Sequence, residues 1–147
     1  MINVLYYDNV KAVKINTKVV KARRIWTKAL LSGKYKQGIN SLAVKKKGDV
    51  PVRKVTNKLT IKDNKFCCLG VACHVLKMDR ACINNEYDVL TNKGMAKVGL
   101  HGATLSELTS FNDIHGTNFK EIAKKIDAVT DDMEAVINEI KDGMRKS

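Results

Sequence analysis

An uncharged apolar stretch, residues 66–76 (FCCLGVACHVL), constrains the fold more than any other part of this sequence. It stands out in a chain in which 29% of residues are charged. Most of its residues are small or unbranched, which favours a helix over a strand, and a helix that is apolar on every side must be covered by other elements. We therefore predict a buried central helix at residues 66–77, with Asn64 as its candidate N-cap and Lys77 in its last turn.

Gly70 lies in the middle of this predicted helix. A glycine at such a position costs about 1 kcal/mol relative to alanine. We therefore expect Gly70 to be where a neighbouring backbone approaches the helix closely.

The chain has 147 residues, 44% of them hydrophobic, which predicts a single domain over residues 1–147 with its own core. We recognise no signal peptide and no apolar run of about 20 residues, so we expect a cytoplasmic protein without a membrane partner. Three of the four cysteines lie in the apolar stretch. Such crowding is typical of buried thiols in a reducing compartment rather than of a disulfide framework.

The net charge of +12 is concentrated in the first half of the chain. Residues 1–65 contain 17 Lys and Arg against 3 acids, whereas residues 66–147 contain 10 against 12. This asymmetry indicates an anionic partner for the first half, either nucleic acid, a nucleotide or an acidic face of a protein. The alternative is that the lysines simply occupy solvated positions.

Before the central helix, the residue pattern predicts three units. Residues 1–16 contain two alternating runs separated by Asp8-Asn9, which predicts an N-terminal β-hairpin. Residues 17–33 have apolar residues three and four apart, which predicts the first helix, with Trp26 packed in the core. Residues 34–65 are predicted to form a small basic antiparallel sheet. Its expected strands are residues 39–44, 50–55 and 59–61.

After the central helix, residues 78–147 are predicted to be mainly helical. Residues 87–90 have the character of a short strand or extended segment. A small helix should follow, capped by Thr91 or Asn92 and stopped at Gly99.

Three further helices are expected towards the end of the chain. Thr104 and Glu107 form a capping box that predicts a short helix through residue 110. Asn118 should begin the next helix, and a final helix should run from Asp131 to Gly143. The predicted fold class is therefore α+β, with a small antiparallel sheet packed on a buried Cys-rich central helix and closed by C-terminal helices.

Cations in two regions are the candidate ligand-binding residues. One group forms a stripe opposite the apolar face of the first helix, and the other decorates the predicted sheet. If the two groups meet on one face, they can bind phosphate and release its counterions. The aromatic content of 5% gives little support to recognition of single strands by base stacking. The candidates are Lys21, Arg24, Lys28, Lys45, Lys46, Lys47, Arg53 and Lys54.

Three sequence blocks occur in an order that is similar to a known family. They are Trp26-x-x-Ala29-Leu30-x-Ser32-Gly33-x-Tyr35-x-Gln37-Gly38, Phe66-Cys67-Cys68-Leu69-Gly70-Val71-x-Cys73, and Phe111-Asn112-Asp113 with Phe119-x-x-Ile122-Ala123. Across residues 26–126 the chain resembles a family of small uncharacterised proteins of tailed bacteriophages. The resemblance implies a phage accessory protein in the cytoplasm of an infected bacterium, without a defined reaction. Two features depart from the family: residues 44–62 look like an added basic hairpin, and His74 replaces a frequent Asp, so no catalytic role is carried onto it.

Catalysis by a cysteine nucleophile is one alternative. Cys67 and Cys68 lie near the predicted start of the central helix, where the helix dipole stabilises a thiolate. A base is missing, because His74 lies about two turns along the same helix and His101 and His115 would have to return from loops. The pattern therefore favours structural thiols, and binding over enzymatic activity.

The sequence predicts neither a metal site nor a cofactor. The cysteines and His74 lack the two-residue spacing of zinc ligands, and neighbouring helical residues point about 100° apart. Phosphate-loop and dinucleotide fingerprints are absent from the sequence.

The predicted function is non-catalytic binding of an anionic partner, nucleic acid or a nucleotide signal, during infection, in keeping with counter-defence. A protein-binding inhibitor of a host or defence factor is the alternative from a different class. The sequence is compatible with an oligomer.

Overall fold

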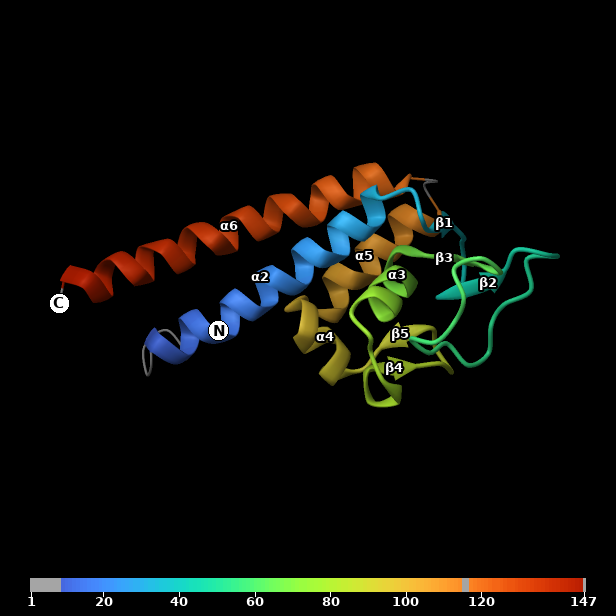
Figure 1. Ribbon diagram of the computed structural model, residues 1–147, viewed down its shortest axis with the longest axis horizontal. Helices are drawn as coiled ribbons and strands as arrows, with labels where there is room; N and C mark the ends of the chain where they lie inside the picture. The colour runs from blue at the N-terminus through green and yellow to red at the C-terminus, as the bar shows by residue number, and fades with distance from the viewer. Residues whose placement is uncertain (1–8, 115–116, 147) are drawn as a thin grey trace.

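The computed structural model describes residues 9–114 and 117–146 of the chain. Two long helices, α2 (Asn9–Leu31) and α6 (Phe119–Lys146), lie side by side and run in opposite directions (Figure 1). The shorter helices and two small sheets form a body against the end of this pair where α6 begins (Figure 1). The predicted α+β fold class is confirmed. The shorter helices are α3 (Cys68–Val75), the 3-10 turn η1 (Arg80–Cys82), α4 (Asn92–Val98) and α5 (Gly102–Asp113).

The first sheet has three strands in the order β1 (Lys36–Gln37), β3 (Asn64–Phe66) and β2 (Ala43–Lys45). β3 pairs antiparallel with β2 and parallel with β1, and the sequence pattern predicted neither β1 nor β3 as a strand. The second sheet is the antiparallel pair β4 (Ile83–Asn84) and β5 (Val89–Leu90).

Of the predicted strands, only residues 39–44 overlap a strand of this sheet, β2. Residues 50–55 contribute a single bridge, between Pro51 and Val44, and residues 59–61 form no strand. In the loop between β2 and β3, side chains satisfy backbone groups that a strand would pair. The Val55 amide, for example, donates to Asn85 Oδ1 at 2.8 Å. Side-chain bonds of this kind, here to a residue 30 positions away, replace a ladder.

The predicted N-terminal hairpin is wrong over residues 10–15, which belong to α2. Residues 1–8 of that prediction lie outside the described part of the chain. The helix begins before the predicted 17–33 because Ala12, Asn16 and Val19, spaced by four and three, are all buried on one face, and it ends at Leu31. This helical period prevails over the weak alternation of the same residues.

The two final predicted helices are one continuous helix, α6. Asn118 caps it as expected, since its side-chain oxygen accepts the Glu121 amide at 3.0 Å. The predicted break before Asp131 is wrong, because Thr130 is buried and its hydroxyl donates to a carbonyl one turn earlier at 2.6 Å. The predicted stop at Gly143 is also wrong, because the helix continues through this residue.

α3 is the predicted central helix, buried over Cys68–Cys73. It is shorter than the predicted 66–77, because Phe66 belongs to β3 and Lys77 has a φ of 53°. Trp26 has no exposed surface, and its indole donates to the Cys68 carbonyl at 2.9 Å, which confirms its predicted place in the core.

The cap of α3 differs from the prediction. Cys67 is the N-cap, and its thiol accepts the Gly70 amide at 3.4 Å. Asn64 instead lies in β3 and donates to the Thr60 carbonyl at 2.9 Å. Asn64 therefore belongs to the sheet and does not form the helix cap that the sequence pattern predicted.

Gly70 is the point of close backbone approach, as predicted. The Leu42 carbonyl, directly before β2, lies against its Cα, and a Cβ at this position would overlap the carbonyl oxygen. The same oxygen accepts the Cys67 amide at 3.1 Å. The sheet and α3 therefore meet backbone to backbone.

The helices after α3 follow the prediction in part. Thr91 caps α4 through its hydroxyl, and Gly99 ends it with a φ of 61°, both as expected. α5 begins at Gly102 without a side-chain cap, so Thr104 and Glu107 lie inside the helix and the predicted capping box is wrong. Within the described residues, no helix combines the length and apolar character needed to cross a membrane.

Replacement of Gly70 by alanine tests the close approach. We expect Gly70→Ala to destabilise the fold by about 3 kcal/mol, because the added methyl group can be accommodated only by moving backbone. The matched control is Gly143→Ala, where a Cβ meets nothing within 4 Å. That helical position should gain up to about 1 kcal/mol. Urea unfolding measures both, and equal effects of the two substitutions would contradict the packing described.

Candidate functional site

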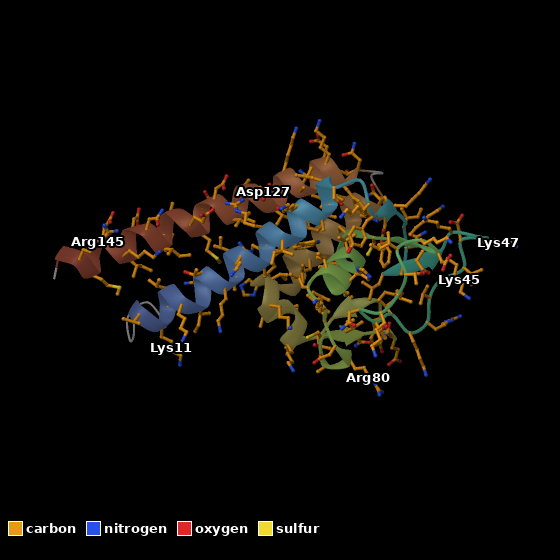
Figure 2. The ribbon with its side chains drawn as sticks, viewed as in Figure 1. Lys11, Lys45, Lys47, Arg80, Asp127 and Arg145 are labelled. Carbon is orange, nitrogen blue, oxygen red and sulfur yellow. The ribbon has the colours of Figure 1, made fainter. Side chains whose placement is uncertain are left out.

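Lysines gather around a concave surface at the sheet end of the molecule. Figure 2 shows Lys45 and Lys47 at this end and Lys11 and Arg145 near the other. The surface, here called the lysine concavity, encloses about 550 Å³ and is bordered by five lysines and one carboxylate. Its lining residues are Lys45, Lys46, Lys47, Val52, Lys58, Leu59, Thr60, Lys62, Asp63 and Asn64.

The backbone around β2 builds one side of this concavity. Residues 43–52 form a two-stranded antiparallel hairpin, here called the ribbon. Within it, the Lys45 amide donates to the Val50 carbonyl at 2.8 Å and the Val52 amide to the Ala43 carbonyl at 2.9 Å. The Lys46 amide donates outward to the Asp63 carbonyl at 2.9 Å. These bonds fix the lysine-bearing backbone against the turn that leads into β3.

His74 contacts the loop that forms another side of the lysine concavity. Its Nε2 lies 2.9 Å from the Leu59 carbonyl, and its Nδ1 lies 2.6 Å from the Tyr35 hydroxyl. Because a carbonyl only accepts, Nε2 donates to the Leu59 carbonyl, and Nδ1 forms its hydrogen bond with the Tyr35 hydroxyl. Burial raises the pKa of Tyr35. His74 thus holds the loop that carries Leu59, a role that no spacing in the sequence indicated.

The structure divides the predicted lysines of the sheet region. Lys45, Lys46 and Lys47 line the concavity, as do two lysines that the sequence analysis did not select, Lys58 and Lys62. Arg53 and Lys54 are exposed on the same loop but are not among the lining residues. Sequence spacing could not distinguish the cations that line the concavity from those that do not, because the direction of each side chain depends on the irregular path of residues 53–63.

At the centre of the predicted cationic stripe on the first helix, Arg24 forms ion pairs with other residues of the chain. Arg24 donates to Asp127 at 2.9 Å, to Asp131 at 2.6 Å and to Glu134. The hydrogen bonds that Arg24 donates to Glu134 and Asp131 raise its pKa above the ordinary value. Its guanidinium therefore joins α2 to α6 and is already occupied by carboxylates.

The rest of that stripe stands apart from the concavity. Lys21 and Lys28 are exposed, and neither is among the residues that line the lysine concavity. The expected merging of the helix stripe with the sheet lysines is therefore not seen at this concavity. The candidate site consists of the sheet lysines alone.

Arg23, which the sequence analysis did not single out, has a structural role. It is 2% exposed, and its guanidinium donates to the carbonyls of Val98 at 2.7 Å and Gly99 at 2.8 Å. Burial lowers its pKa. The available signal was its position four residues after Val19, which places it on the buried face of α2.

The candidate nucleophiles are buried. Burial raises the pKa of Cys67 to about 12, and it raises the pKa values of Cys68 and Cys73 as well. The Cys68 thiol donates to the Leu108 carbonyl at 3.8 Å. Thiols of this kind are poor nucleophiles, because the reactive form is the thiolate. Among residues 9–114 and 117–146, no three His, Cys, Asp or Glu side chains are placed to hold a metal ion.

No protein-family model, curated protein or solved structure matches this chain. The resemblance to the phage family, and the host cytoplasm that it implies, therefore stay predictions. The candidate site depends on its own geometry and charge.

Removal of the Arg24 network should weaken the contact between α2 and α6. We expect Arg24→Ala to cost about 1 kcal/mol, because exposed ion pairs are weak singly but three carboxylates lose one shared partner. The loss should shrink at high salt, which screens the pairs. The control is Arg145→Ala, which removes a single pair with Asp142 on an exposed turn. Equal losses of unfolding free energy in the two variants would contradict a special role for Arg24.

The thiols should be unreactive in the folded protein. At neutral pH, we expect iodoacetamide to label Cys67 and Cys68 only after denaturation, because burial keeps both protonated and covered. Mass spectrometry of native and urea-treated samples measures the labelling, and the denatured sample is the control. Rapid labelling of either thiol in the native protein would restore the nucleophile alternative.

Proposed function

We propose that the protein binds a phosphate-bearing anion, nucleic acid or a nucleotide, at the lysine concavity without catalysing a reaction. The observation that supports this most is the gathering of five lysines and one carboxylate around a single hollow. Ammonium groups are strong donors to phosphate, and binding releases the counterions of the ligand. A concave surface lets several of them reach the same ligand.

The five lysines are also free of ion pairs within the part of the chain that the structure describes. Neighbouring Lys65 shows the contrast, since it pairs with Asp49 at 2.9 Å. Like charges held close together repel one another, and an anion relieves that repulsion. The concavity is therefore electrostatically prepared for an external anion, whereas Lys65 is neutralised within the chain.

The lining of the concavity favours binding over chemistry. Its side chains are lysines, two apolar residues and three small polar or acidic residues, without a histidine, cysteine or tyrosine. The buried thiols of α3 supply no alternative nucleophile. This composition is suited to holding an anion rather than to transforming it.

The biological setting is proposed from the sequence resemblance. A phage accessory protein with this activity would act in the infected host cell, where nucleic acids and nucleotide defence signals are both available ligands. The rival proposal, inhibition of a host or defence protein, would use the same lysines against an acidic protein face.

A salt titration with site variants tests the proposal. We expect Lys46→Ala/Lys47→Ala to weaken binding of labelled DNA or nucleotide and to reduce the slope of log K against log salt by about 2, because each lysine neutralises one phosphate. Fluorescence anisotropy over a range of salt concentrations measures affinity and slope. Absence of binding to DNA, RNA and nucleotides even at low salt would reject the proposal.

Two further double variants serve as controls. Lys120→Ala/Lys141→Ala removes the same charge from exposed positions of α6 and should leave the slope almost unchanged. Lys21→Ala/Lys28→Ala asks whether the stripe on α2 contributes. If the α6 control loses as much affinity as the concavity variant, only net charge matters and the site is wrong. A host protein that binds the wild type after nuclease treatment, and not the concavity variant, would favour the rival.

A further inference from the structure

The ribbon, residues 43–52, lies between two hollows, and its tip extends beyond the pairing of β2 with β3. Side chains alternate along a strand, so Lys45 and Val52 lie on one face of the ribbon and Val44 and Pro51 on the other. The first pair lines the lysine concavity, and the second pair lines another hollow of about 530 Å³, here called the polar concavity. Its lining residues are Gln37, Gly38, Ile39, Asn40, Ser41, Val44, Asp49, Pro51 and Lys65.

The tip of the ribbon is basic, exposed and formed by a tight turn. The tip comprises residues 46–49, in which Gly48 and Asp49 have φ values of 81° and 51°. Lys47 lies at the outermost end of the molecule in the view of Figure 2. Beside the turn, Val50 is 52% exposed, an apolar side chain presented to solvent next to the lysines.

The polar concavity differs from its neighbour in charge. Lys65 is paired with Asp49, and the Gln37 amide is already bonded to Asn112 and to the backbone of residue 117. The remaining polar side chains, Asn40 and Ser41, are neutral. The ribbon therefore has one strongly cationic flank and one neutral polar flank.

Stacking of unpaired bases has little support in this region. Trp26 and Phe66 have no exposed surface, and the Tyr35 ring packs edge-on against Phe66 while its hydroxyl bonds to His74. Neither concavity is lined by an aromatic side chain. A protein that holds single strands by stacking needs such platforms.

We infer that the ligand is double-stranded DNA and that the tip of the ribbon enters its major groove, with one phosphate backbone in the lysine concavity and the neutral polar concavity facing the opposite side of the groove. This inference rests on the proposed function. A projection between two hollows is the complement of a groove between two ridges, whereas a nucleotide needs only one hollow. The B-DNA major groove is about 12 Å wide and admits a two-stranded ribbon.

The same geometry favours the major groove of B-DNA over the grooves of duplex RNA and over the minor groove of DNA. The major groove of A-form RNA is deep and narrow, and side chains cannot read it. The minor groove of B-DNA is about 6 Å wide, too narrow for both strands of the ribbon. In the major groove, exposed Val50 can contact a thymine methyl group, and Lys47 can reach the acceptor atoms of guanine.

Chemical footprinting locates the ribbon on the duplex directly. Dimethyl sulfate methylates guanine N7 in the major groove and adenine N3 in the minor groove, so the two are read in one experiment. We expect the bound protein to protect guanine N7 and to leave adenine N3 reactive. Protection of adenine N3 alone would overturn the placement in the major groove.

Affinities for matched ligands test the ligand class. At equal length and salt, we expect the DNA duplex to bind about tenfold more tightly than the RNA duplex or the single strand. Equal or tighter binding of single strands or nucleotides would overturn this inference and leave the proposed function intact. Failure of every nucleic acid and nucleotide to bind would remove both.

A variant at the ribbon separates groove entry from simple attraction of charge. Val50→Asp places a carboxylate beside the tip, at a residue that lies opposite Lys45 but is itself outside the lining of both concavities. It should weaken duplex binding about tenfold but single-strand binding much less. Val10→Asp, an equal change at a residue that is 64% exposed on α2, is the control. Circular dichroism confirms that both variants fold. Equal losses on the duplex and the single strand for Val50→Asp would contradict the entry of the ribbon.

Discussion

The backbone contact between Gly70 of α3 and the Leu42 carbonyl is the constraint on which the rest of the structure depends. No side chain fits between them, and the same carbonyl accepts the Cys67 amide at the start of the helix. On another side of α3, the Trp26 indole bonds to the Cys68 carbonyl and brings α2 against the helix. A short buried helix thereby joins the sheet to the long helix pair.

This contact determines how the candidate site is presented. Leu42 directly precedes the ribbon, so the lysine-bearing hairpin starts at the core and projects away from it. The base of the lysine concavity is formed by Val52 and Leu59, which pack against the core. The hydrogen bond from His74 to the Leu59 carbonyl holds the loop there. Charged side chains can then gather at one place without being buried, because apolar and neutral polar groups carry the packing beneath them.

The cations of the first half of the chain have separate uses. Arg23 donates to the end of α4, Arg24 joins α2 to the acids of α6, and Lys65 pairs with Asp49. The lysines of the concavity form no such pairs among the described residues and are the ones offered to a ligand. A count of charges cannot tell these uses apart, because each depends on which acceptor the fold brings near. The acceptors lie from 16 to more than 100 residues away along the chain.

The sequence by itself determined the features that depend on local composition: the fold class, the buried Cys-rich helix, the close approach at Gly70, the core position of Trp26 and the lysine-rich region of the site. Only the tertiary structure decided the length of α2 and α6, the parallel pairing of β1 with β3, the second hollow and the division of the cations. Residues 10–15 and 130–143 carry weak or interrupted local signals, and their helices continue because Ala12, Thr130 and Ile137 are buried. Long-range packing and pairing have no local period, which is why residue spacing could not reveal them.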